Sequence, residues 1–425
     1  MPAHKGKGRL GFEQYDITEI DGADSLFEAK GIIEKSEQNA SYLFGCPTFY
    51  STEGSSLCIR AMLYLAKLCG VKKVFSTRNS HKTFLTAIGL LDIDVEWLYP
   101  KSSHSYLASD FDEDALKSAL ENSEDKCAVY ITSPDYLGNI ADIAKISAIC
   151  KEFDAYLLVD NAHGAYLKFL PESEFPIDLG ADMCCSSAHK TLPVLTGGAY
   201  LHIAANSNDR FISNAKNALS LFGSTSPSYL ILQSLDIANK YIYNGYKSTL
   251  SEYIKKVELI KNKLIDNGYE LSGCEALKIV IKTKKYGYYG HQIANILMRS
   301  DIFCEFYDKD NIVFMLSPEI SENELDRLCK SLCAINRKVS IDELPPKIPH
   351  PQVSITAREA IFGESERIKA SESCGRVLAQ FNIACPPAVP ILICGESIDE
   401  QMIKCFEYYE TEYISVIKDE KETEI

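Results

Sequence analysis

The sequence predicts an α/β protein whose large domain is a three-layer α/β/α sandwich with a mainly parallel sheet. Two observations lead to this fold class. Between residues 40 and 205, short β-rich runs alternate with segments of helical spacing, an order typical of a parallel sheet covered by helices on both faces. In addition, 425 residues exceed what one hydrophobic core usually serves. We therefore expect a smaller α/β region and a C-terminal α+β domain as well.

The expected elements of the large domain follow one another in a regular order. Five runs read as strands: Lys72–Thr77, Asp94–Tyr99, Cys127–Thr132, Tyr156–Asp160 and Met183–Ser186. Four segments with helical spacing lie near or between them: Ser55–Cys69, Lys82–Leu91, Asp112–Glu121 and Ile140–Phe153. In a parallel sheet, ligands bind at the carboxyl ends of the strands. Reactive residues are therefore expected directly after these strands.

The pattern changes beyond residue 205. Ser228–Ile265 reads as a nearly continuous helix that is interrupted at Asn244–Gly245, and strand candidates follow at Lys278–Lys282 and Asn311–Leu316. Leu344–Pro351 then holds four prolines in eight residues and is a linker by composition. The expected division is a large domain over residues 1–235, a small α/β region over 236–343, a linker over 344–353 and a C-terminal domain over 354–425.

The composition excludes several classes of protein. With 46% hydrophobic and 24% charged residues the chain is neither disordered nor fibrous. The 44 basic and 59 acidic residues give a net charge of −15, which disfavours nucleic acid and anionic lipid as partners. No apolar run approaches the roughly 18 residues of a membrane span, and no signal peptide is recognised. Fifteen cysteines without a CxxC pair indicate a reduced, cytoplasmic protein without a metal site.

Two candidate reactive residues follow the last two predicted strands. Asp160 ends the apolar run YLLVD and is followed by Asn161, Ala162 and His163. A carboxylate there could ligate a metal, act as a base or pair with a cationic ring nitrogen, and a helix N-cap is the structural alternative. Lys190 lies in CCSSAHKT between apolar segments. A buried lysine can become nucleophilic and form a Schiff base with an aldehyde, whereas most lysines are simply solvated.

Two further segments supply phosphate donors and a flat ring. FYSTEGSS at 49–56 offers backbone N–H and hydroxyl groups at a helix start, although serine there is also an ordinary cap. TRNSHKT at 77–83 places His81 after another strand, where a lone histidine is more often structural. Taken together, phosphate donors, a flat ring, a carboxylate and an amine match the requirements of pyridoxal phosphate.

These motifs resemble those of the ornithine/lysine/arginine decarboxylase family of pyridoxal phosphate enzymes, which have the aspartate-aminotransferase fold, or fold type I. The resemblance follows the family order over nearly the whole chain. Its segments are PAHKG at 2–6, YDITEIDGADSLFEAKGII at 15–33, TEGSS at 52–56, RNSHKT at 78–83, TSPDYLG at 132–138, VDNAHG at 159–164, SAHKTLPVLTGGAYLH at 187–202, TSPSYLIL at 225–232, TAREAIF at 356–362 and PPAVPILICGE at 386–396.

The resemblance implies a role for each candidate residue. Lys190 would form the Schiff base with His189 beside it, Asp160 would pair with the pyridine nitrogen, and His81 would stack on the ring. His163, in the turn after Asp160, is also expected to contact the cofactor. The implied phosphate contacts are Gly54, Ser55, Ser56 and Ser187, and Thr225 or Ser226 for the phosphate of the neighbouring subunit. This last contact implies a homodimer with shared active sites.

The implied reaction is decarboxylation of arginine, lysine or ornithine to an amine and CO2, within polyamine biosynthesis. Which amino acid is used stays open, because five residues depart from the family pattern: Ala3, Phe27, Glu53, Asp135 and Asn161. The fold does not fix which bond is broken, so transamination and aldol cleavage on the same cofactor are alternatives. A non-catalytic relative that binds the cofactor is a second alternative.

Overall fold

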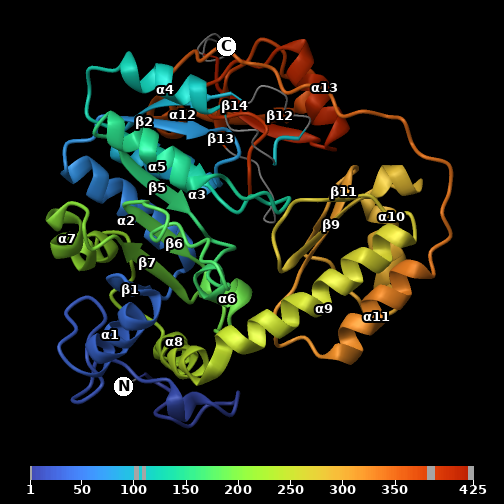
Figure 1. Cartoon of the computed structure of the whole chain (residues 1–425). Coiled ribbons are helices and arrows are strands. Elements are labelled where there is room, and N and C mark those ends of the chain that lie inside the picture. The colour runs from blue at the N-terminus through green and yellow to red at the C-terminus, as the bar shows by residue number, and fades with distance from the viewer. Residues whose placement is uncertain (1, 100–104, 108–111, 381–387, 420–425) are drawn as a thin grey trace.

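The computed structural model describes residues 2–99, 105–107, 112–380 and 388–419. Its large domain is built on a seven-stranded sheet of order β1-β7-β6-β5-β4-β2-β3 (Figure 1). The strands are β1 (Thr48–Ser51), β2 (Lys73–Thr77), β3 (Asp94–Leu98), β4 (Cys127–Thr132), β5 (Tyr156–Asp160), β6 (Met183–Ser186) and β7 (Ala199–Ile203). β2 to β6 pair in parallel, whereas β7 is antiparallel to both β6 and β1. The predicted α/β class with a mainly parallel sheet is confirmed.

Helices cover both faces of this sheet. They are α1 (Ile32–Phe44), α2 (Gly54–Leu68), α3 (Lys82–Leu91), α4 (Glu113–Glu121), α5 (Ile143–Glu152), α6 (Ala188–Thr191), α7 (Asp209–Ser220) and α8 (Tyr229–Tyr241). Alternate strand residues enter different cores: Val129 and Val159 pack with α1 and α5, whereas Tyr130 and Leu158 pack with α2, α3 and α7. Because successive strand residues point to opposite faces, this alternation produces the three predicted layers.

A small domain follows on the other side of a kinked helix. Gly245, with φ of 104°, separates α8 from α9 (Lys247–Asp266), which leads away from the large domain (Figure 1). The antiparallel sheet of this domain has the order β10-β11-β9-β8. Its elements are β8 (Leu271–Ser272), β9 (Lys278–Lys282), β10 (Phe306–Tyr307), β11 (Asn311–Met315), α10 (Gly290–Met298) and α11 (Glu322–Cys333).

The last part of the chain returns to the large domain. Residues 336–352 contain neither helix nor strand, and they lead to a three-stranded antiparallel sheet of order β12-β14-β13. Its elements are α12 (Ala357–Phe362), β12 (Ser365–Lys369), β13 (Leu378–Gln380), α13 (Glu400–Tyr408) and β14 (Tyr413–Ile417). Arg358 of α12 donates to the carbonyl oxygen of Gly89 at 3.1 Å, so this domain is fastened to α3.

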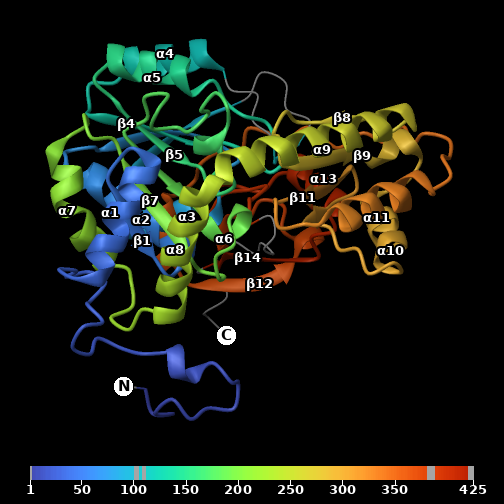
Figure 2. The same cartoon turned by 60° about the horizontal axis from the view of Figure 1, so that its bottom comes forward.

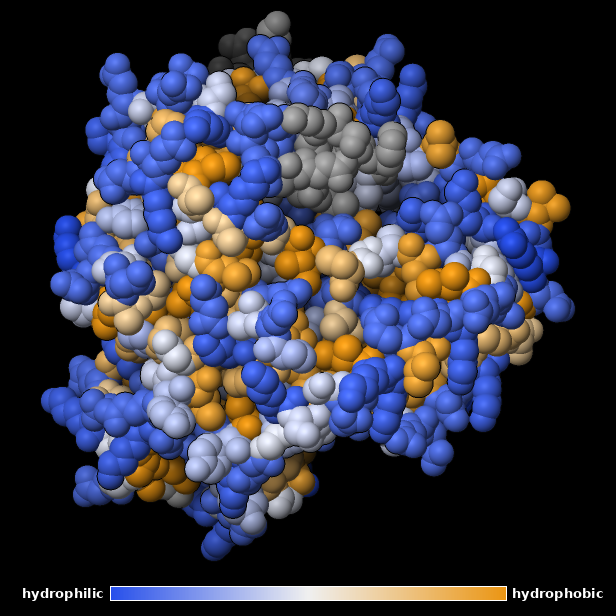
Figure 3. All heavy atoms as spheres, in the orientation of Figure 1, coloured by the Kyte–Doolittle hydropathy of each residue, from blue (hydrophilic) through white to orange (hydrophobic). Residues whose placement is uncertain are grey.

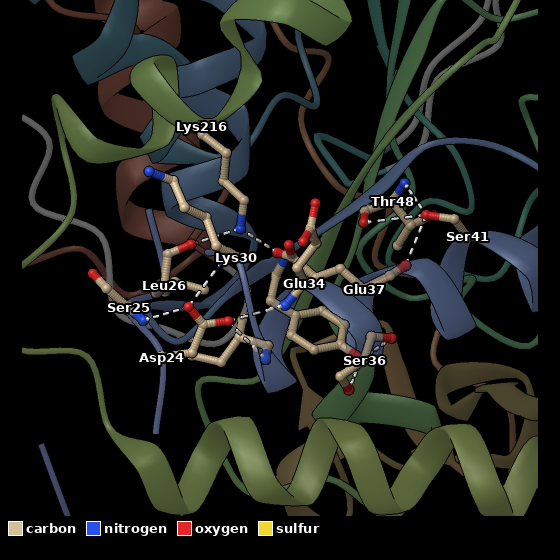
Figure 4. Close-up of polar contacts among 12 residues, drawn as sticks. Asp24, Ser25, Leu26, Lys30, Glu34, Ser36, Glu37, Ser41, Thr48 and Lys216 are labelled. Carbon is tan, nitrogen blue, oxygen red and sulfur yellow. Dashed lines mark hydrogen bonds and ion pairs between the residues drawn. The ribbon is translucent and has the colours of Figure 1, made fainter. Parts of the chain in front are cut away.

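The segment before α1 projects from the body of the molecule, as Figure 2 shows. Asp24 anchors its end, because its carboxylate accepts the backbone N–H groups of Ser25, Lys30, Gly31 and Ile33 at 2.7–3.0 Å (Figure 4). Desolvation opposes ionisation of this carboxyl, but the backbone hydrogen bonds prevail and lower its pKa to about 2. Among the described helices, none is both long and apolar enough to cross a membrane.

Candidate active site

The carboxyl edge of the large sheet brings the candidate residues together. His81 follows β2, Asp160 ends β5 and Lys190 lies in α6, directly after β6. β5 and β6 are neighbours, and β4 alone separates β5 from β2. Because parallel strands end at the same edge of a sheet, these side chains converge although they are distant in the sequence.

Asp160 is buried at the end of β5, where its carboxylate accepts three hydrogen bonds. The donors are the hydroxyl of Tyr130 at 3.2 Å, the backbone N–H of Ala162 at 3.2 Å and the thiol of Cys185 at 3.6 Å. Burial raises the pKa of Asp160, while positive charge on Lys190, when that lysine is protonated, acts in the opposite direction. A cation placed against this carboxylate would therefore stabilise its ionised form.

Lys190 is linked to the small domain through His163. Lys190 Nζ lies 2.8 Å from His163 Nε2, and Lys278 Nζ, from β9, lies 3.0 Å from His163 Nδ1. The ring of Tyr136 meets the imidazole edge-on, with 5.1 Å between the ring centroids. Burial first, and then the positive charges that Lys190, when protonated, and Lys278 place beside the ring, hold the pKa of His163 well below its usual range. This imidazole is therefore neutral near pH 7.

His81 forms the N-cap of α3. Its Nδ1 accepts the backbone N–H of Thr83 at 3.1 Å, which leaves the proton of the neutral ring on Nε2. Burial, assisted by positive charge on Lys190 when that lysine is protonated, lowers the pKa of His81 to about 4. The ring is therefore an uncharged, flat face at neutral pH, which can stack on an aromatic ligand.

Hydroxyl groups gather at the N-terminus of α2. The hydroxyl of Ser187 donates to Ser55 Oγ at 2.9 Å, and Ser56 Oγ lies 3.0 Å from Thr83 Oγ1. Gly54 opens the helix with φ of 69°, and no atom lies within 4 Å of the position that a side chain would take there. This open helix start, with its backbone N–H and hydroxyl groups, is suited to a phosphate.

Thr225 and Ser226 lie in an exposed loop before α8. The backbone N–H of Ser224 in this loop donates to the carboxylate of Glu53 at 2.6 Å. Glu53, one of the departures from the family pattern, therefore fastens the loop beside the start of α2. The expected contact of Thr225 or Ser226 with a neighbouring subunit stays a prediction.

Three further residues of the predicted site have local partners. His189 Nδ1 lies 3.1 Å from the carbonyl oxygen of Gly198, and burial lowers the pKa of this histidine. The amide of Asn161 donates to the hydroxyl of Ser186 at 3.0 Å. The Asp135 carboxylate accepts the backbone and side-chain N–H groups of Asn139, at 2.9 and 2.7 Å. Asn161 and Asp135, both departures from the family pattern, are thus tied into local structure.

The sequence did not single out three residues that the structure places at or behind this site: Tyr130, Lys278 and Glu396. Tyr130 and Lys278 belong to apolar strands. A polar side chain within such a strand was the one sequence feature that could have marked them as functional candidates. Glu396 pairs with Arg78 in a bidentate ion pair, with 3.0 Å between Arg78 Nη2 and Glu396 Oε2. No local pattern could have indicated that pair, because the two residues come from different domains.

The donor set fits pyridoxal phosphate. This cofactor needs an amine for its aldehyde, a carboxylate for its ring nitrogen, a flat partner for its ring and hydrogen-bond donors for its phosphate. Lys190, Asp160, His81 and the start of α2 supply these four kinds of group at one edge of the sheet. Within the described residues, no cluster of three His, Cys, Asp or Glu side chains could hold a metal ion.

Family models match most of the chain. The major domain of the Orn/Lys/Arg decarboxylases matches residues 12–285, and their C-terminal domain matches residues 341–414. The chain belongs to the Orn/Lys/Arg decarboxylase family. This member is 31% identical to an arginine decarboxylase of Bacillus subtilis, over 91% of the chain and 83% of that relative. It is 30% identical to an arginine decarboxylase of Halalkalibacterium halodurans, over 91% of the chain and 82% of that relative.

Solved structures with a similar fold include decarboxylases. The lysine decarboxylase of Francisella novicida aligns with a TM-score of 0.78 and 16% identity, over 98% of the chain and 78% of that structure. The constitutive lysine decarboxylase of E. coli aligns with a TM-score of 0.75 and 17% identity, over 98% of the chain and 79% of that structure. At this identity they show the fold of this Orn/Lys/Arg decarboxylase family member, and they confirm the predicted fold type.

Proposed function

We propose that the protein is a pyridoxal phosphate-dependent carbon–carbon lyase that decarboxylates arginine, lysine or ornithine. The observation that carries the proposal is the convergence of Lys190, Asp160 and His81 in a member of a decarboxylase family. The name of that family states the three amino acids. Arginine is the first substrate to assay, because the two relatives described above are arginine decarboxylases.

Each site residue would have a distinct task. Lys190 would hold the aldehyde carbon of the cofactor, Asp160 would keep a proton on its ring nitrogen, and the neutral His81 would cover its ring. When bound, pyridoxal phosphate draws electrons away from the bond to the substrate carboxyl group, so that CO2 can leave. Lys190, or His189 beside it in α6, would return a proton to the α carbon.

The phosphate of the cofactor would bind at the start of α2. The hydroxyl of Ser187 contacts that of Ser55, the hydroxyl of Ser56 contacts that of Thr83, and Gly54 leaves the approach open. His163 would contact the cofactor beside Lys190, to which it is hydrogen bonded.

We further propose a homodimer that shares its active sites. Large apolar side chains are exposed on the N-terminal segment, on α1, on α8 and in the kinked turn after α8, among them Tyr15, Ile32, Ile237 and Tyr243. The first three line a groove of about 510 Å³. Figure 3 shows orange apolar patches where α1 and α8 reach the surface. A second copy would cover these side chains and the projecting N-terminal segment, as stable interfaces do with apolar surface.

The substrate class and the free cysteines support a metabolic role and a cellular compartment for the protein. Agmatine, cadaverine or putrescine would be the product, which we assign to polyamine biosynthesis in the cytoplasm. The fourteen cysteines within the described residues are all free, and free thiols are typical of a reducing compartment.

The deciding assay incubates the protein with pyridoxal phosphate and each of the twenty amino acids, and measures CO2 and amine. We expect both products from a basic amino acid, and we expect borohydride to fix the cofactor on Lys190. Lys190→Ala should abolish turnover, whereas Lys145→Ala, at an exposed lysine paired with Glu113, should not. A keto acid product would instead indicate transamination, and cleavage to glycine an aldol reaction. Cofactor binding without any turnover would indicate a non-catalytic relative.

A further inference from the structure

We infer that Lys278, a buried lysine of the small domain, is a positioning residue that fixes the tautomer of His163 and thereby keeps the amine of Lys190 unprotonated. The inference rests on the proposed function, in which Lys190 needs a lone pair to react with an aldehyde carbon. It assigns the small domain a part in preparing the reactive lysine of the large domain.

The surroundings of Lys278 make it a hydrogen-bond donor. Its side chain is 1% exposed, and its Nζ lies 2.7 Å from Oε2 of Glu275, whose own side chain is fully buried. The same nitrogen donates to the carbonyl oxygen of Asp135 at 3.0 Å and lies 3.0 Å from His163 Nδ1. The carboxylate of Glu275 and the carbonyl oxygen of Asp135 are acceptors, so Lys278 Nζ is the donor in this cluster. Its remaining N–H group points to the ring of His163, and Lys278 therefore donates to His163 Nδ1.

This donation fixes the position of the proton on His163. A neutral imidazole carries one ring proton, so a ring that accepts at Nδ1 carries its proton on Nε2. His163 Nε2 lies 2.8 Å from Lys190 Nζ. An N–H group cannot donate to an ammonium group, which has no lone pair, but it can donate to a free amine. The two contacts of the His163 ring therefore select the unprotonated form of Lys190.

Other titratable groups face the same amine. Asp160 attracts a proton to Lys190, since opposite charges stabilise each other. Behind His163, the carboxylate of Glu275 lies 2.7 Å from Lys278 and offsets the positive charge of that lysine. His81 and His189 are neutral near pH 7, because burial lowers the pKa of both. The contribution of Lys278 at Lys190 is therefore the position of the proton on His163, and not a net charge.

Contacts between the domains hold Lys278 in place. The backbone N–H groups of Cys274 and Glu275 donate to the carbonyl oxygen of Gly138, at 2.8 and 2.9 Å. Gly138 ends the loop after β4 that also carries Asp135. The start of β9 is therefore fixed against the large domain, so the tautomer of His163 depends on the docking of the two domains.

The first test measures the protonation of Lys190 in the full-length protein without added cofactor. The rate at which acetic anhydride labels Lys190 is followed against pH by peptide mass spectrometry. The variant is Lys278→Met combined with Glu275→Gln, which removes both buried charges together. We expect the pH of half-maximal labelling to rise by about one unit, which corresponds to a tenfold change in the protonation equilibrium of Lys190. Lys278→Arg, which keeps the charge and the donors, should restore much of the rate.

A matched control removes another buried lysine of the small domain. Lys284 is 8% exposed and is paired with Asp310 at 2.9 Å, away from His163. Lys284→Met should leave the labelling curve of Lys190 unchanged. If the folded double variant at 278 and 275 also left the curve unchanged, the inference would be wrong.

The second test observes the tautomer itself. Long-range ¹H–¹⁵N NMR of the ring nitrogens, with His163→Asn to identify the signal, should show the Nε2–H form in the unmodified protein. An Nδ1–H form there would overturn the inference, even if the double variant did not fold. If the labelling curve and the tautomer behave as expected but no basic amino acid is decarboxylated, the proposed function fails and the assignment of Lys278 stands.

Discussion

Arg78 and Glu396, which lie 318 positions apart in the chain, form a buried bidentate ion pair between the large domain and the C-terminal domain. Arg78 starts the segment that leads to His81, and Glu396 also accepts the backbone N–H of Ile393 at 2.8 Å. A second contact joins the same two regions, because the backbone N–H of Lys82 donates to the carbonyl oxygen of Ala388 at 2.8 Å. The C-terminal domain therefore holds the loop that carries His81.

Replacing Glu396 tests this connection. Glu396→Gln would leave the charge of Arg78 buried without its carboxylate, which typically costs about 3–5 kcal/mol. We expect a lower urea midpoint together with weaker binding of pyridoxal phosphate, measured by titration of the protein with the cofactor. The control is Glu364→Gln, at an exposed carboxylate 3.8 Å from Lys418. That change should cost less than about 1 kcal/mol. Equal losses in the two variants would refute the connection.

Asp24 should make the stability of the protein depend on pH. Its pKa is lowered to about 2 from the ordinary 3.8, so its contribution is complete above pH 4 and is lost as the pH falls toward 2. Asp24→Asn should therefore cost about 1 kcal/mol at pH 7, as the loss of a partly solvated helix cap does. At pH 2 the two proteins should unfold at nearly the same urea concentration. A difference that is the same at both pH values would contradict the ionic role of Asp24.

The shared active site can be tested with two defective variants. Lys190→Ala removes the reactive amine, and a Thr225→Ala/Ser226→Ala double variant removes the expected phosphate contacts with the neighbouring subunit. If subunits exchange at random and sites act independently, an equal mixture should regain about a quarter of the wild-type sites. Activity of the mixture is measured after exchange has been shown by mass spectrometry. No recovery would mean that each subunit supplies its own phosphate contacts.

Local pattern was sufficient to predict the central part of the fold. The predicted strands at Cys127–Thr132, Tyr156–Asp160 and Met183–Ser186 match β4, β5 and β6 residue for residue, because buried strands are short apolar runs between turn residues. Convergence of Asp160 and Lys190 followed from the same pattern, since parallel strands end at one edge of the sheet. The direction of β7 was not predicted, because the run AYLHI does not indicate whether it pairs in parallel or antiparallel.

The remaining parts of the site depend on contacts between distant segments. Lys278 reaches His163 only because the small domain folds back onto the loop after β4, and Glu396 reaches Arg78 only through the C-terminal domain. Neither of these two contacts can be recognised from the residues that flank it in the sequence. The roles given to Thr225 and Ser226 depend on a second chain, so they stay predictions.

Asp160→Asn tests the proposed chemistry directly. The substitution keeps the size of the side chain and a hydrogen-bonding group, but it removes the negative charge at the end of β5. Without that charge the ring nitrogen of the cofactor would lose its proton, and its capacity to accept electrons would fall. Removing one partner of a buried charge pair typically costs about 3–5 kcal/mol, which corresponds to roughly two to four powers of ten in rate. We therefore expect a folded, coloured protein that still holds the cofactor on Lys190 but is nearly inactive.

The matched control for Asp160 is Asp182, a carboxylate at the opposite, amino-terminal end of β6. It accepts the backbone N–H of Leu157 at 2.8 Å and the hydroxyl of Ser207 at 2.6 Å, away from the candidate site. Asp182→Asn should reduce stability but keep the rate per folded molecule, because its charge does not face the cofactor. If Asp160→Asn instead kept activity within a few-fold of the unmodified protein, Asp160 would be a structural cap of its loop. Another carboxylate would then have to hold the proton on the ring nitrogen.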